Sequence, residues 1–283
     1  MELRKEGAEI YVPDGTPVDE ALARTTHMGV GAHQDDLEIM AYDGILSCFG
    51  QDDMWFFGCT CTNGSGSPRD GLYGDYTDEM MMQVRRQEQK KAAYVGEYGA
   101  QALLNYASSE LRDPENPDPL ADLVDLLRAA RPQWVYTHNF ADKHTTHIGA
   151  AARTLEAIRS LDPDERPQKL WGCEVWRDLD WMLDEEKVAF DVAGHPNLEA
   201  AILGVFDSQD IGGNRYDLAT MGRRRANATY FATHDVELTD SMIFAMDLTP
   251  LIEDDDLDAR EYVRGHIDRF AEHVVEVMDG ILR

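Results

Sequence analysis

Apolar runs and helical patterns alternate through the first 160 residues of the chain. Continuous apolar runs that suit buried strands cover residues 28–32, 54–62, 102–106 and 133–138. Between and after them, apolar residues recur at helical spacing over residues 39–49, 78–98, 120–131 and 148–158. This alternation of strand and helix predicts an α/β fold, with a parallel sheet and helices on both of its faces.

The pattern after residue 160 is less regular. Strands are predicted at 170–176, 188–192 and 241–246, and helices at 197–206 and 258–282. Residues 1–25 are polar, with Pro13, Gly15 and Pro17, and are expected to form an extended arm. No internal repeat or clear linker is visible. We therefore expect one domain over residues 1–283, with a core at about 26–210 and a C-terminal α/β extension at about 211–283.

Composition narrows the choice of partners. The 283 residues include 54 acidic and 26 basic side chains, a net charge of −28 that would repel nucleic-acid phosphates and anionic membranes. No apolar run approaches the roughly 20 residues that span a bilayer, and the N-terminus lacks an apolar signal segment. The four cysteines are expected to be buried and reduced. We expect a cytoplasmic protein that binds a small molecule; the oligomeric state stays open, a homo-oligomer included.

The first candidate site follows the strand at 28–32. That strand ends at His33 and is followed by Asp35 and Asp36, just before a helical pattern. His33 and Asp36 are separated by two residues, so on one tight turn both can reach a single ion. The alternative is structural, because Asp35 or Asp36 could cap the N-terminus of the helix.

A second polar turn follows the strand at 133–138 and also precedes a helix. It carries Asp142, His144 and His147. Because ligands bind at the carboxyl ends of parallel strands, the two turns can face each other across one crevice. A lone histidine on such a turn would more often have a surface or capping role. Two histidines and an aspartate opposite His33 and Asp36 instead predict a metal site.

The chemistry follows from such a set of ligands. Two imidazoles and one carboxylate leave an open position on zinc, which lowers the pKa of bound water to about 7. Asp35, beside Asp36, is placed to accept a proton from that water, and His144 could stabilise an oxyanion or protonate a leaving nitrogen. Hydrolysis of an amide or an ester is the predicted outcome.

These residues resemble the LmbE-like or PIG-L family of zinc deacetylases. The family's His-Pro-Asp-Asp-x-Glu motif is matched by residues 33–38, and its Asp-x-His-x-Asp-His motif by residues 142–147. Weaker matches are an Arg-x-x-Glu element at 85–88 and a His/Asp-x-Ser-Gln element at 206–209. The resemblance covers roughly residues 27–210.

The resemblance implies a Rossmann-like fold and a role for each matched residue. His33, Asp36 and His147 would bind Zn²⁺. Asp35 would be the general base, and His144 would stabilise the tetrahedral intermediate. Arg85 and Asp142 would contact the substrate.

The activity implied is removal of an acetyl group from an N-acetylglucosamine moiety of a small sugar conjugate. Two alternatives remain open. One is a metal amidase that cleaves a thiol–sugar conjugate, and the other is a non-catalytic relative that binds a metal or a sugar.

The chain departs from the family pattern at two positions in the motifs. Gln34 stands in place of the usual proline, and Thr146 in place of the aspartate beside the last ligand, so a supporting contact would have to come from elsewhere. From about residue 211 onward the chain departs most, which leaves the substrate undefined. Trp176, Trp181 and Tyr216 could stack on a sugar, although core packing is the preferred interpretation for each.

Overall fold

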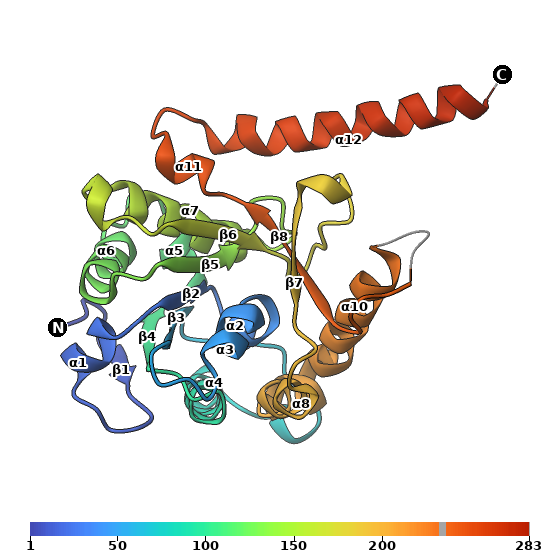
Figure 1. Ribbon diagram of the computed structural model, residues 1–283. Helices are drawn as coiled ribbons and strands as arrows, with labels where there is room; N and C mark the ends of the chain where they lie inside the picture. The colour runs from blue at the N-terminus through green and yellow to red at the C-terminus, as the bar shows by residue number, and fades with distance from the viewer. Residues whose placement is uncertain (232–235, 283) are drawn as a thin grey trace.

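A mixed sheet of eight strands organises the computed structural model, which describes residues 1–231 and 236–282 (Figure 1). Across the sheet the strand order is β1-β4-β3-β2-β5-β6-β8-β7. The strands are β1 (Glu9–Tyr11), β2 (His27–Gly31), β3 (Phe56–Thr62), β4 (Ala100–Tyr106), β5 (Trp134–His138), β6 (Lys169–Cys173), β7 (Lys187–Asp191) and β8 (Met242–Asp247).

The five central strands, from β4 to β6, run parallel to one another. The parallel sheet predicted from the alternating pattern is therefore confirmed for the centre of the fold. At the edges, β1 pairs antiparallel with β4, and β8 pairs antiparallel with both β6 and β7. Because β8 lies between two strands of the predicted core, the C-terminal extension contributes to the same sheet; the division into core and extension stays a prediction.

Helices cover both faces of the sheet, as the pattern predicted. One face packs against α1, α6 and α7, and the other against α2, α3, α4 and α8 (Figure 1). The helices of the described residues are α1 (Val18–Ala23), α2 (Asp36–Met40), α3 (Tyr42–Cys48), α4 (Asp78–Val95), α5 (Ser108–Arg112), α6 (Asp118–Ala130), α7 (Thr145–Arg159), α8 (Pro196–Leu203), α9 (Asp207–Gln209), α10 (Tyr216–Tyr230), α11 (Pro250–Glu253) and α12 (Ala259–Ile281).

Several details differ from the sequence prediction. The helix expected at 39–49 is two helices, because the backbone leaves helical geometry at Ala41, between α2 and α3. The N-terminal arm contains β1 and α1, and α10 was not predicted. β1 has only three residues, so it carries no strong periodic signal.

Two glycines of β2 bring α2 close to the sheet and so fix where its first residue lies. A Cβ on Gly29 would lie 2.9 Å from the Leu37 side chain, and one on Gly31 would lie 3.1 Å from Asp36 Cβ. A larger residue at either position would push α2 away from the strand. The sequence of β2 therefore determines the position of Asp36.

The cysteines and the helices agree with two expectations from composition. All four cysteines lie within the described residues, and each is buried with a free thiol. Across residues 1–231 and 236–282, no helix combines the length and apolarity that a membrane crossing requires.

His27, at the start of β2, should make the fold sensitive to mild acid. It is buried beneath Trp134, with ring centroids 4.5 Å apart, and burial lowers its pKa to about 4. In the unfolded chain His27 takes up a proton near pH 6.5, whereas in the folded protein it does so only near pH 4. The folded state is therefore unaffected by this histidine above pH 6.5 and loses stability as the pH falls from 6.5 toward 4. In His27→Gln, we expect the loss of unfolding free energy between pH 7 and 4 to shrink by about 3 kcal/mol at most. Urea unfolding of wild type and His27→Gln at pH 7 and pH 4 measures these free energies. An equal loss in both proteins would show that His27 does not cause the acid sensitivity.

Candidate functional site

The turn between β2 and α2 carries the first three site residues. Its backbone is unusual at Asp35, where φ is 82°, a left-handed conformation that is uncommon for residues other than glycine. The Asp35 N–H donates to Gln89 Oε1 at 3.2 Å, which helps to hold this conformation. The turn is closed by a hydrogen bond from the His33 N–H to Asp36 Oδ2 at 2.6 Å. His33 and Asp36 are thereby held on the same side of the turn.

Gln34 fastens this turn to the neighbouring strand. Its side-chain Nε2 donates to the carbonyl oxygen of Thr62, at the end of β3, at 2.9 Å. Where the family has a proline to stiffen the turn, this chain uses a buried hydrogen bond. The departure leaves His33 and Asp36 close together.

The second turn lies between β5 and α7, and β5 is the parallel neighbour of β2. His144 is the N-cap of α7, and its Nδ1 accepts the Thr146 N–H at 3.2 Å. His147 lies in the first turn of the helix and is fully buried. The prediction that the two turns face each other is therefore met by the topology.

Donor atoms of three residues from the two turns lie close together in a triangle, in which Asp36 presents one carboxylate oxygen to each histidine. His33 Nδ1 lies 3.2 Å from His147 Nε2 and 3.4 Å from Asp36 Oδ2, while His147 Nε2 lies 3.4 Å from Asp36 Oδ1. Two ligands of a tetrahedral zinc, each about 2.0–2.1 Å from the ion, are separated by about 3.3–3.4 Å. The spacing and the N/O chemistry of these donors therefore fit a zinc ion.

His138, which was not selected from the sequence, lies directly behind this triangle. Its ring stacks on His147 with centroids 4.0 Å apart, and its Nε2 lies 3.3 Å from Asp36 Oδ2. The same Nε2 accepts the Ala32 N–H at 3.0 Å, so its lone pair is engaged. By proximity alone, Asp36, His138 and His147 form one possible metal group, and His33, His144 and His147 another. The backbone hydrogen bond favours a supporting role for His138.

Asp142 lies behind His147 and is also buried. Its Oδ1 is 3.5 Å from His147 Nδ1 and accepts the His144 N–H at 2.9 Å, while its Oδ2 accepts the Trp176 N–H at 3.1 Å. With both oxygens engaged inside the protein, this geometry favours positioning of His147 over the substrate contact that the resemblance implied. Asp142 also supplies the supporting carboxylate that Thr146 cannot provide.

Replacing Asp142 by asparagine tests this positioning role. The variant keeps the size of the side chain but removes the negative charge next to His147 Nδ1. Such supporting carboxylates orient a ligating imidazole, so we expect zinc affinity to fall by about 10–100-fold. Competition with a chromophoric chelator measures the affinity. Unchanged zinc affinity with a raised KM would instead assign Asp142 to the substrate.

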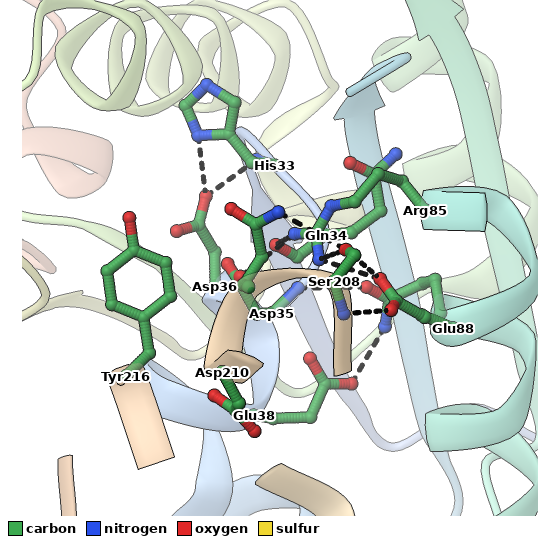
Figure 2. Close-up of polar contacts among 12 residues, drawn as sticks. His33, Gln34, Asp35, Asp36, Glu38, Arg85, Glu88, Ser208, Asp210 and Tyr216 are labelled. Carbon is green, nitrogen blue, oxygen red and sulfur yellow. Dashed lines mark hydrogen bonds and ion pairs between the residues drawn. The ribbon is translucent and has the colours of Figure 1, made fainter. Parts of the chain in front are cut away.

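Asp35 is held by a buried ionic network rather than by the metal triangle. Arg85, on α4, donates to Asp35 Oδ2 at 2.9 Å and to Glu88 Oε2 at 2.9 Å (Figure 2). Ser208, in α9, donates its N–H and its hydroxyl to the two oxygens of Glu88. The two weaker sequence matches, at 85–88 and 206–209, thus meet in one network behind Asp35.

Arg85 therefore contacts the general-base candidate directly. Its side chain is 2% exposed, although it contributes to the wall of the site cavity. Asp35 Oδ1 has no hydrogen-bond partner within the described part of the chain. Asp35 can therefore accept a proton or a hydrogen bond from the cavity on Oδ1 while Oδ2 stays bonded to Arg85.

The charges of the site residues suit a cation site next to a base. Burial raises the pKa of Asp35 to about 7, with Arg85 opposing and Asp36 adding to the shift. Burial also opposes ionisation of Asp36, but His147 and His138 outweigh it and hold its pKa well below the usual range. Burial lowers the pKa of His147 to about 4, and burial with the nearby His33 lowers that of His144. Ionised Asp36 and neutral imidazoles are the forms that coordinate a metal.

A cavity of about 760 Å³ opens onto these groups. His33, Asp35, Asp36 and His144 contribute to its wall. The glycine- and serine-rich loop at 63–68 forms another side of the cavity. The size suits a small molecule rather than a polymer chain.

The three aromatic residues considered for sugar stacking lie in different surroundings: Trp176 and Tyr216 at the cavity, Trp181 at the core. Trp176 is 44% exposed and Tyr216 lies nearby, with ring centroids 6.0 Å apart; both line the cavity. Figure 2 shows Tyr216 pointing to the side of the site where Asp36 lies. Core packing was therefore the wrong preference for these two residues, whereas Trp181 does pack against the core.

Comparisons with known proteins confirm the resemblance. Residues 28–158 match the family model described as PIG-L, GlcNAc-PI de-N-acetylase. Among solved structures, the chain is similar to N,N′-diacetylchitobiose deacetylase from Pyrococcus horikoshii (15% identity, 78% of this chain and 84% of that chain, TM-score 0.56). It is also similar to the A40926 pseudoaglycone deacetylase Dbv21 (16% identity, 80% and 98%, TM-score 0.55).

A further structural relative catalyses a different reaction. The 4-carboxy-2-hydroxymuconate hydratase GalB from Pseudomonas putida has 14% identity, with 79% of this chain and 95% of that chain covered, and a TM-score of 0.62. At such identities the structures establish a shared α/β fold, and the reaction must be argued from the site.

Proposed function

Residues 28–158 belong to the PIG-L (LmbE-like) family, and on this premise we propose that the protein is a zinc-dependent N-deacetylase. Its substrate would be a small sugar conjugate with an N-acetylglucosamine-type moiety. The observation that carries the proposal is the triangle of His33 Nδ1, Asp36 and His147 Nε2, placed at a cavity that Asp35 also lines.

The proposed zinc ligands are His33, Asp36 and His147. Zinc held by them would supply Lewis-acid chemistry, because it polarises a carbonyl group and lowers the pKa of water to about 7. Teicoplanin deacetylase Orf2, another structurally similar protein (14% identity, TM-score 0.51), has a zinc-inhibited form. That form supports zinc binding by this fold.

In the proposed reaction, Asp35 accepts a proton from the attacking water while the water oxygen bonds to the acetyl carbon. The proton then passes to the substrate nitrogen as the C–N bond breaks, which yields a free amine and acetic acid, and the acid ionises to acetate by releasing its proton to water. Arg85 holds Asp35 Oδ2 throughout, so Oδ1 is the proton-accepting oxygen. Because His144 Nδ1 accepts a backbone N–H, the neutral ring carries its proton on Nε2 and can donate it to the developing oxyanion.

The buried carboxylate of Asp35 also favours a catalytic role over simple binding. A metal- or sugar-binding protein needs no buried carboxylate with a pKa of about 7 beside its ligands. A cleavable thiol–sugar conjugate would fit the same chemistry, since it also presents an amide. The acyl group and the rest of the substrate therefore have to be identified by assay.

Acetate release from a panel of N-acetylated sugars, with and without a chelator, tests the proposed function. We expect release from at least one N-acetylglucosamine conjugate and loss of that release after chelation, with recovery on adding zinc. Cleavage confined to thiol–sugar conjugates would favour the amidase. Absence of cleavage, or cleavage that a chelator leaves unchanged, would contradict the zinc hydrolase.

Two arginines in the cavity wall suggest what else the substrate carries. Arg112 and Arg223 donate to hydroxyl or carbonyl oxygens and form no direct ion pair among the described residues, although Arg223 lies near enough to the buried Glu174 to oppose the rise in the pKa of that carboxyl. Arg85 and Arg224, also in the wall, are both ion-paired. Guanidinium groups that line the cavity without a direct ion pair suit an anionic group on the substrate.

Substitution of these arginines should therefore change substrate preference. In Arg112→Gln or Arg223→Gln, we expect KM for a glycoside with a carboxylate or phosphate to rise about tenfold, as loss of a charge-assisted hydrogen bond predicts. KM for a neutral glycoside should stay unchanged. Arg264→Gln, on α12, is the matched control. Equal effects on charged and neutral substrates would contradict the charge-recognition role.

A further inference from the structure

The last helix leaves the body of the protein. Figure 1 shows α12 running along the molecule and then past it toward the C-terminus. Its first turns are anchored, because the Tyr262 hydroxyl donates to the Asp247 carbonyl at 2.6 Å and His266 Nδ1 lies 2.8 Å from Glu186 Oε2. Arg269 also pairs with Glu186. Residues 271–282 are exposed on every side of the helix.

Beyond these anchors α12 continues as an exposed arm, which we define as residues 267–282. Arg159 and Arg166 bind backbone carbonyls of the connection that leads into α12, including those of Leu257 and Ile252. The root of the helix is therefore fixed in both position and direction. A partner of the arm would therefore meet a helix whose first turns are already held in place.

Apolar residues on α12 follow a heptad pattern. They are separated alternately by four and three positions: Val263, Ile267, Phe270, Val274, Val277 and Ile281. Val263 is buried against the body, but Ile267 is 46% exposed, Val277 49% and Ile281 75%. A repeat of 3.5 residues is the pattern that packs one helix against another by knobs into holes. A helix lying on its own sheet would follow the wider 3.6-residue stripe.

The charges on the arm point to a second copy of the same chain as its partner. All four acids of residues 263–281 occupy outer positions of the heptad: Asp268, Glu272, Glu276 and Asp279. The positions that flank the apolar seam carry only neutral or basic side chains: Arg264, His266, Ala271, His273, Met278 and Gly280. Two copies of a chain with net charge −28 can therefore bring this face together without opposing carboxylates.

We propose that the arm forms a coiled coil with the arm of another copy, so that the protein is a homo-oligomer. Apart from Phe270, the core positions of the arm are β-branched, at Ile267, Val274, Val277 and Ile281, and β-branched residues at both kinds of core position favour three or more strands over two. A membrane surface suits the arm less well, since interfacial helices are basic on their polar face and this one is acidic.

Matched aspartate substitutions test the proposal. Val274→Asp and Val277→Asp place a charge in the seam, whereas Val275→Asp makes the same change at a neighbouring outer position that is 56% exposed. By light scattering on a sizing column, we expect wild type and Val275→Asp to have a mass that is a multiple of 31.9 kDa. The two seam variants should be monomers with unchanged acetate release and circular dichroism.

Any of four outcomes would overturn this inference. The first is a monomeric wild type across a concentration series. The second is dissociation by Val275→Asp as complete as that by Val274→Asp, which would indicate a non-specific apolar patch. The third is an oligomer that persists when residues 271–283 are removed. Binding of wild type, but not Val274→Asp, to lipid vesicles without self-association would assign the arm to a membrane instead.

Discussion

Replacing Asp35 by asparagine should lower kcat by about 10³-fold while zinc binding is retained, because a positioned general base contributes about 10²–10⁴-fold to such reactions. The amide can still bond to Arg85 and fill the same space, but it cannot accept a proton. Asp35 is not one of the three proposed ligands, so metal content should stay near one zinc per chain. Turnover and metal analysis on the same preparation measure both quantities.

Asp43→Asn is the matched control for this variant. Asp43 is partly buried and accepts the Tyr136 hydroxyl at 2.7 Å, but it does not line the cavity. We expect it to affect stability while turnover stays close to that of wild type. If Asp35→Asn kept wild-type turnover, or lost its zinc together with its activity, the role of general base would have to be withdrawn.

The second large effect is expected at His147. In His147→Gln the Nε2 donor is lost from the triangle, and two donors from a single turn remain. We expect zinc affinity to fall by more than about 100-fold, beyond the loss that follows removal of a supporting residue, and turnover to fall with it. Equilibrium dialysis against buffered zinc measures the affinity.

His138→Gln separates the ligand from its stacked neighbour. His138 lies against His147 and close to Asp36, but its Nε2 is engaged by the Ala32 N–H. We expect this variant to keep one zinc per chain. Loss of zinc from His138→Gln, with zinc retained in His147→Gln, would identify Asp36 and His138 as the ligand pair and contradict the proposed set.

The sequence predicted those features whose signal is local. Strand β2 and the turn that follows it appear as an apolar run ending in His33, Asp35 and Asp36 within eleven residues. The buried central strands read as continuous apolar runs, as expected for strands covered on both faces. Local patterns of this kind determine an element wherever it later packs.

Features that depend on distant partners could not be predicted in the same way. His138 reads as the last residue of a strand, and only the neighbouring Ala32 and the stacked His147 make it part of the site. The insertion of β8 between β6 and β7 is set by pairing between distant segments. Trp176 looks like a core residue in the sequence, but it lies in the cavity wall because β6 ends before it.

The most direct test of the central claim is a crystal structure of the zinc-loaded protein with data collected on both sides of the zinc absorption edge. We expect one anomalous peak at about 2.0–2.2 Å from His33 Nδ1, His147 Nε2 and a carboxylate oxygen of Asp36, facing the cavity beside Asp35. A peak held by His138 in place of His33, or no peak between the two turns, would contradict the zinc site from which the proposed reaction is argued.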